Sequence, residues 1–116
     1  MVTVVLWLFV IMRRSQTQSQ ANHLKTLIIC IGNSDNKLTQ LEWAAFCEAV
    51  GRAVRHEAVK IHFKGGTNYD SQYQTACWVC EIPEENIAAL RDHLTSIRIN
   101  YNQDSIATVL GDTEFV

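Results

Sequence analysis

The chain has 116 residues, of which 47% are hydrophobic and 19% are charged, and ten basic against twelve acidic residues give a formal net charge of −2. This size suits one small globular domain with just enough apolar surface to build its own core. A slightly acidic chain without a cluster of Lys and Arg differs from non-specific nucleic-acid binders, which need cations to meet phosphates. We therefore expect no nucleic-acid partner.

Residues 1–22 differ in composition from the rest. Residues 1–12 are nearly all apolar, but a membrane-spanning helix needs roughly 20 such residues, and we expect no membrane partner. A secretory signal carries its basic residues before the apolar run, whereas Arg13 and Arg14 follow it, although 19–21 could serve as a cleavage site. Because Met12 begins an ordinary polar N-terminus, we interpret residues 1–11 as an upstream extension of the reading frame. The Gln- and Ser-rich segment 15–22 is typical of a flexible tail, which leaves residues 23–116 for the domain.

The four cysteines have the pattern of reduced, core-filling thiols, which is typical of a cytoplasmic protein. Cys30, Cys77 and Cys80 lie in apolar runs and Cys47 lies on a predicted helix. On a strand, residues three apart point to opposite faces, so the thiols of Cys77 and Cys80 should diverge. No second pair of Cys or His is spaced to complete a metal site. We expect structural cysteines, with no cofactor and no metal.

The first predicted strand covers residues 24–31, a continuous apolar run that indicates burial on both faces. A loop follows, and then Thr39 and Glu42 have the spacing of a capping box, which starts a helix. Apolar residues recur along this helix at helical spacing and predict one buried stripe. The members of the stripe are Trp43, Phe46, Cys47, Val50 and Val54. We expect the helix to end near residue 55 or 56.

The second predicted strand, residues 58–64, alternates cleanly, which indicates an edge strand with one face on a core. Val59, Ile61 and Phe63 should point to one side, and Lys60, His62 and Lys64 to the other. After a glycine turn, residues 75–82 predict a central strand that is apolar on both sides. Cys77 and Val79 point one way along it, and Trp78, Cys80 and Ile82 the other. Their proximity in sequence predicts a hairpin.

The second helix should begin at Pro83, since proline suits the first turn and Glu84 and Glu85 suit the positive end of the helix. Its apolar stripe is Ile87, Leu90, Leu94 and Ile97. A last strand is predicted at residues 105–110. The order β-α-β-β-α-β, with two-sided apolar strands first and third, predicts an antiparallel sheet of order 4-1-3-2 with both helices on one face. This is the α+β, ferredoxin-like arrangement.

Two helices cover one face of such a sheet and leave the other bare. If Trp78, Cys80 and Ile82 lie on the bare face, it is too apolar to stay in water. A shift of one residue would place Cys77 and Val79 there instead, and the face would still be apolar. We expect a second copy of the chain to cover it, sheet to sheet, about a two-fold axis. Our first hypothesis is therefore a non-enzymatic, homodimeric binding module.

A ligand pocket on the same face is the basis of a second hypothesis. The residues that we expect to line a pocket for a small anionic or aromatic ligand are Lys60, His62, Lys64, Tyr69, Tyr73 and Trp78. His62 is the candidate general base, because an imidazole titrates near neutrality, but the sequence supplies no evident nucleophile or orienting carboxylate for it. The alternative is a solvated edge strand whose lysines discourage aggregation.

Acidic residues in the predicted loops give a third hypothesis, a metal-dependent nucleic-acid-processing protein. Clustered carboxylates could bind Mg²⁺ for phosphodiester chemistry. The residues concerned are Asp35, Asp70, Asp104, Asp112 and Glu114. Their spacing matches no metal-binding motif, and acidic residues in loops are commonly just solvated turns.

Residues 101–107 (YNQDSIA) and 111–115 (GDTEF) resemble the endings of small bacterial and phage-borne proteins that are grouped as domains of unknown function. The resemblance covers the last third of the chain and implies this fold, with no activity attached. RNA-recognition domains fit less well, because residues 74–79 lack the glycines and the basic residue of their third strand. The overall plan is similar to that of dimeric α/β-barrel monooxygenases and isomerases. That resemblance implies a cofactor-free enzyme with His62 and Tyr69 or Tyr73 in the pocket.

Overall fold

The computed structural model describes residues 23–33, 35–68 and 73–116. The predicted extension and tail at residues 1–22 lie outside the described residues, as do Tyr69 and Asp70. In the described part of the chain, no helix has the length and apolar character that crossing a membrane requires.

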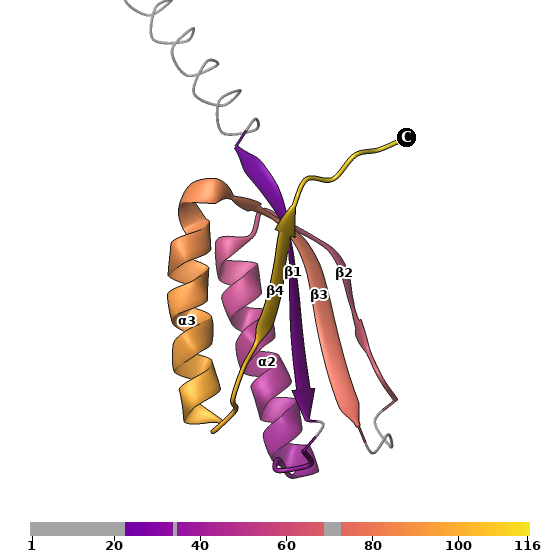
Figure 1. Cartoon of the computed structure of the whole chain (residues 1–116), viewed down its shortest axis with the longest axis vertical. Coiled ribbons are helices and arrows are strands. Elements are labelled where there is room, and N and C mark those ends of the chain that lie inside the picture. Colours follow the sequence, from indigo (N-terminus) through magenta and orange to yellow (C-terminus); the bar gives the residue numbers. More distant parts are fainter. Residues whose placement is uncertain (1–22, 34, 69–72) are drawn as a thin grey trace, which may run out of the picture.

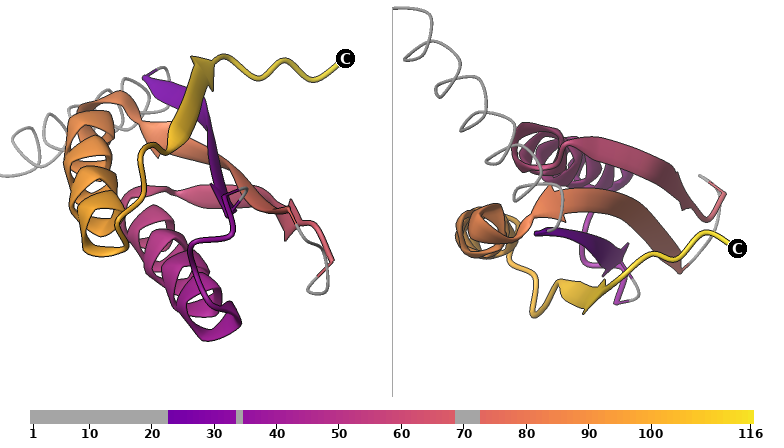
Figure 2. Two further views of the ribbon diagram at one scale, coloured as in Figure 1. Left: turned by 60° about the horizontal axis from the view of Figure 1, so that its bottom comes forward. Right: turned by 90° about the horizontal axis from the view of Figure 1, so that it is seen from above.

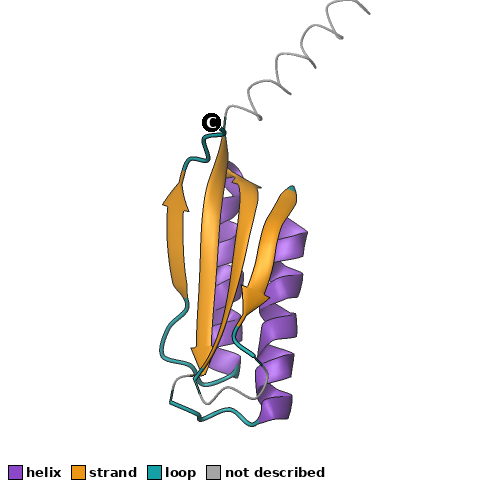
Figure 3. Ribbon diagram, turned by 90° about the vertical axis from the view of Figure 1, so that its right-hand side faces the viewer, coloured by secondary structure: helices purple, strands orange, loops and turns teal. Residues whose placement is uncertain are grey.

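Four antiparallel strands form one sheet, in the order β2-β3-β1-β4. Their bounds are Leu24–Asn33 for β1, Lys60–Gly66 for β2, Gln74–Pro83 for β3 and Ala107–Gly111 for β4. The helices α2 (Gln40–Glu57) and α3 (Ile87–Asn100) lie side by side on one face of the sheet, and its other face is open (Figures 1 and 3). The predicted α+β class, the antiparallel sheet and the order 4-1-3-2, read from the other edge, are confirmed.

The helix-covered face of the sheet carries the core. Because β1 and β3 pair without a break from Leu24 opposite Pro83 to Asn33 opposite Gln74, alternate residues of both strands share this face. The fully buried side chains come from both central strands and both helices: Leu27, Ile29, Trp78, Cys80, Ile82, Phe46, Val50, Val54 and Leu90. The expectation that the Trp78 side of this strand forms the bare face is therefore wrong. Trp78, Cys80 and Ile82 face the helices, because the bulkier row fills the space between the layers, and Cys77 and Val79 face the open side.

The helix α2 begins with the predicted capping box. The Thr39 hydroxyl accepts a hydrogen bond from the Glu42 backbone N–H at 3.2 Å, and the Thr39 N–H donates to the Glu42 carboxylate at 3.0 Å. The helix ends at Glu57, close to the expected position. The second helix begins later than expected, because Pro83 still pairs with Leu24 in the sheet and keeps an extended backbone. A short 3₁₀ turn, Glu84–Asn86, then leads into α3.

A β-bulge interrupts β2 at His62. Ile61 lies opposite Cys80, whereas Phe63 lies opposite Val79, so that His62 is the extra residue. A bulge of this kind reverses the alternation that follows it. Lys64 consequently lies on the helix side, with its ammonium 5.9 Å from the centre of the Trp78 ring, while Phe63 joins Val79 on the open side. The prediction that Lys60, His62 and Lys64 share one face is therefore wrong for Lys64.

Candidate functional site: the open face of the sheet

An apolar row crosses the open face from one edge of the sheet to the other. The strand register places Phe63, Val79, Ile28 and Val109 side by side, one from each of β2, β3, β1 and β4. We call these four residues the apolar row. Phe63 is 56% exposed and Val109 57% exposed, and the two central members are half-buried between their neighbours. A continuous apolar row of this kind is a feature of interaction surfaces.

A second row, one step further along the strands, carries two thiols. Cys30 lies directly opposite Cys77, and their sulfur atoms are 3.4 Å apart. Burial, followed by the hydrogen bond and charge interaction with Cys30, raises the pKa of Cys77 to about 11. The expected divergence of Cys77 and Cys80 is confirmed, since Cys80 is buried on the helix side. The sequence could not bring Cys30 to Cys77, because their meeting depends on the register of two distant strands.

A polar row, formed by Lys60, His62 and Glu81, lies on the other side of the apolar row. The bulge directs His62 at Glu81 of β3, and the distance from His62 Nε2 to Glu81 Oε1 is 3.1 Å. Their side chains are only 25% and 24% exposed, which shields the pair from part of the solvent. Glu81 is the orienting carboxylate that sequence reasoning missed. Its signal was an acidic residue inside an otherwise apolar central strand.

The C-terminal tail, residues 112–116, contacts the polar row. Asp112 pairs with Lys25 at 3.1 Å, and the hydroxyl of Thr113 meets that of Thr26 on the open face. The Phe115 ring then lies edge-on to the His62 imidazole, with 6.5 Å between ring centres. Figures 1 and 2 show the tail leaving β4 away from the helices. The tail therefore runs from β4 across the open face to β2, along the polar row.

The described members of the six residues predicted to line a pocket do not all lie on one face. Lys60 and His62 lie on the open face, whereas Trp78 is fully buried on the opposite side of the sheet. Lys64 lines a groove of about 340 Å³ on that helix side, beside Trp43 and Cys47 of α2. Tyr73 is exposed just before β3, and Tyr69 lies outside the described residues. Of the described members, Lys60 and His62 share the open face, where Glu81 lies beside them.

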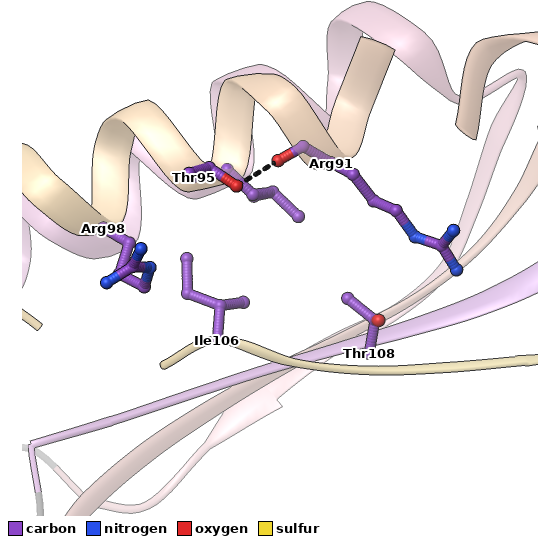
Figure 4. A pocket seen from close by; sticks show the side chains of 6 residues that line it. Arg91, Thr95, Arg98, Ile106 and Thr108 are labelled. Atoms are coloured by element: carbon purple, nitrogen blue, oxygen red, sulfur yellow. Dashed lines mark hydrogen bonds between the residues drawn. The ribbon is translucent and has the colours of Figure 1, made fainter. Parts of the chain in front are cut away.

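A separate pocket of about 210 Å³ lies between α3 and β4 (Figure 4). Its lining consists of two arginines, two threonines and two aliphatic side chains: Arg91, Arg98, Thr95, Thr108, Leu94 and Ile106. Arg98 donates to the Gln103 carbonyl at 3.1 Å and so fixes the turn between α3 and β4. The Thr95 hydroxyl donates to the Arg91 carbonyl at 2.8 Å, within the helix. None of the residues predicted for a site lies in this pocket.

Two of the loop acids, Asp35 and Asp104, line one pocket of about 310 Å³, whereas Asp112 lies elsewhere. Asp35 pairs with Lys37 at 3.4 Å and Asp112 with Lys25, on different parts of the surface. Among the residues that the structure describes, no three His, Cys, Asp or Glu side chains converge on a position that could hold a metal ion. Asp70, the other loop acid of interest, lies outside those residues.

The chain matches no protein-family model and no curated protein. The geometry of the open face is therefore the basis for any functional assignment.

Proposed function

We propose that the chain is a ferredoxin-like domain of the cytoplasm that works as a binding module and forms a homodimer through its open face. The observation that carries this proposal is the apolar row, which reaches across all four strands. Burial of apolar surface contributes about 25 cal/mol for each Å² removed from water. Phe63 and Val109, at the two ends of the row, each leave more than half of their surface exposed in a single chain.

A second copy of the chain is the partner that suits this face. Under a two-fold axis the same patch meets itself, so the apolar row of one protomer can pack on that of the other. The flanking polar row carries both signs of charge, in Lys60 and Glu81. A face that holds both signs beside an apolar strip is self-complementary, because Lys60 of one copy can meet Glu81 of the other.

The face is large enough for a small specific interface. Four strands spaced about 4.8 Å apart, with about eight residues each, cover roughly 500 Å² in projection. Each partner of a standard interface contributes about 800 Å² of accessible surface. The corrugation of the side chains makes the accessible area of the face larger than its projection. We therefore expect an interface near the lower end of the standard size range.

Sedimentation equilibrium tests this proposal. Phe63→Glu and Val109→Glu place a charge in the apolar row at exposed positions, so the fold should survive, as circular dichroism would show. We expect each variant to shift the dimer dissociation constant upward by at least tenfold. Leu41→Glu, at a residue of α2 that is 83% exposed, is the matched control and should leave it unchanged. A wild-type chain that stays monomeric at high concentration would refute the proposal.

A second candidate is a cofactor-free enzyme with its pocket on the same face. The pair formed by His62 and Glu81 favours it, because a carboxylate beside an imidazole can orient the ring as a general base. Lys60, opposite Glu81, would attract an anionic group. Benzoate, a small aromatic anion, is a suitable probe in a nitrogen-15 NMR titration. Shift changes confined to Lys60, His62 and Phe63 would support a ligand site, and their persistence in His62→Gln would remove His62 from it.

A further inference from the structure

The two thiols of the open face are placed for reaction with each other. Cys30 and Cys77 are directly opposite on adjacent antiparallel strands, where α-carbons lie about 4.5–5.5 Å apart. That separation is inside the range of about 4.4–6.8 Å that disulfides span. Their sulfur atoms already lie in contact at 3.4 Å, and both side chains are half-buried, so that a small reagent can reach them.

We propose that Cys30 and Cys77 are a redox-active dithiol, which a low-molecular-weight disulfide such as glutathione disulfide converts into a reversible cross-strand disulfide. The reaction is two successive thiol–disulfide exchanges. One cysteine, as thiolate, attacks a sulfur of the small disulfide, forms a mixed disulfide and expels one small thiolate. The other cysteine then attacks the protein sulfur of that mixed disulfide and expels the second. The protein loses two protons and two electrons, and the small disulfide is reduced to two thiols.

The other cysteines cannot take part in this reaction without breaking the sheet. Cys80 is buried on the opposite side of β3, and Cys47 lies on α2. The second exchange should be fast, because the register holds the two sulfurs together and the attack is intramolecular. Since burial holds Cys77 mainly as the thiol at neutral pH, the first exchange should accelerate as pH rises toward the raised pKa of Cys77.

The dithiol does not require a dimer, but the two features are linked if both exist. The thiols occupy the row next to the apolar row, so a sheet-to-sheet dimer would cover them. On that point alone the inference rests on the proposed function. Reaction with a small disulfide should then be several-fold slower at protein concentrations above the dimer dissociation constant than below it, and the monomeric Phe63→Glu variant should show no such dependence.

The test uses the full chain, reduced and then equilibrated without oxygen in mixtures of reduced and oxidised glutathione at mildly alkaline pH. The protein is then unfolded so that the buried Cys80 can also react. Its free thiols are alkylated, and it is examined by intact mass and peptide mapping. We expect the loss of two hydrogens, a Cys30–Cys77 linkage, and alkylation of Cys47 and Cys80. A persistent glutathione adduct on Cys30 or Cys77, a linkage that involves another cysteine, or four alkylated cysteines under the most oxidising mixture would each overturn the proposal.

Two variants distinguish this outcome from misfolding and from failure of the dimer. Cys30→Ser should leave Cys77 with a stable glutathione adduct, because no second thiol can displace it, while Cys47→Ser should form the disulfide as the wild type does. Circular dichroism checks that both are folded. Repeating the oxidation in Phe63→Glu separates the two proposals. A disulfide formed there supports the dithiol whatever the oligomeric state, and its absence in this folded variant refutes the dithiol alone.

Discussion

His62 Nε2 lies 3.1 Å from Glu81 Oε1 because a bulge in β2 moves His62 out of step with the strand beside it. Ile61 and Phe63 pair with successive residues of β3, whereas His62 has no partner in the register and its side chain is directed toward β3. The bulge thus does two things at once: it forms the His62–Glu81 pair and it directs Phe63 to the open face. The polar row and one end of the apolar row have a common origin.

The contact between His62 and Glu81 predicts the tautomer of the imidazole. A carboxylate only accepts hydrogen bonds, so the neutral ring should carry its proton on Nε2. Long-range proton–nitrogen NMR correlation at alkaline pH measures this directly. We expect the Nε2–H form in the wild type and a mixture of the two tautomers in Glu81→Ala. Finding the Nδ1–H form in the wild type would mean that the pair does not exist in solution.

The capping box of α2 should contribute stability that depends on pH. The hydrogen bond from the Thr39 backbone lowers the pKa of the Glu42 carboxyl. A lowered pKa in the folded state means that the ionised Glu42 stabilises the fold above its unfolded pKa, and that this contribution disappears as the pH falls through the folded pKa. Urea unfolding of wild type and Glu42→Gln should differ at about pH 7 and agree at about pH 3. An equal difference at both values would contradict the role of the charge.

The Thr39 hydroxyl supports the same helix end independently of pH. Thr39→Ala removes the acceptor for the Glu42 backbone N–H and should lower the free energy of unfolding by about 1 kcal/mol. Thr39→Ser keeps an acceptor and is the matched control. An alanine variant as stable as the serine variant would show that solvent replaces the cap without cost.

Two glycines should respond in opposite ways to alanine. At Gly51, inside α2, an added methyl meets the exposed Arg55 guanidinium, which pairs with Glu48, at 3.2 Å and Trp78 Nε1 at 3.5 Å, which is tolerable. The better helix propensity of alanine should stabilise the fold by up to about 1 kcal/mol. At Gly66 the methyl meets the backbone carbonyl of Thr75, so alanine should cost about 1–3 kcal/mol. Denaturant unfolding of both variants checks the contrast, and destabilisation by Gly51→Ala would contradict it.

The buried polar side chain of Asn33 should contribute to the stability of the fold. It is fully buried, and its amide pairs with both the N–H and the carbonyl of Leu38, each at 3.0 Å. Asn33→Leu leaves two backbone groups without partners, at about 1–3 kcal/mol for each. The exposed Asp35→Ala in the same loop is the control, with a change within about 0.5 kcal/mol. Equal effects in urea unfolding would show that Asn33 has no special role.

The order of the sheet could be predicted from sequence because the composition of each strand indicates whether one or both of its faces are buried. The strands β1 and β3 are apolar on both sides and must lie centrally, and the edge strands β2 and β4 are the more exposed ones. The side of β3 that faces the helices could not be chosen, since both of its sides are apolar. The structure chooses the side with Trp78, whose ring needs the depth between the two layers.

The site was harder to predict because each part of it depends on pairing between distant strands. The alternation of residues 60–64 reads as unbroken, and only the ladder with β3 reveals the bulge at His62. The meeting of Cys30 with Cys77 and of His62 with Glu81 follows from strand register. The contact of Phe115 with His62 joins the tail to the far edge strand, which no local pattern indicates.

Intermolecular nuclear Overhauser effects test most directly whether the open face joins two copies of the chain. Equal amounts of carbon-13-labelled and unlabelled protein would be mixed at a concentration where sedimentation shows dimer. Self-association through the sheet predicts cross-peaks between the methyl groups of Ile28, Val79 and Val109 and the Phe63 ring of the other copy. Cross-peaks that arise instead from Leu41 of α2 or Ile99 of α3, or a chain that is monomeric at millimolar concentration, would contradict it.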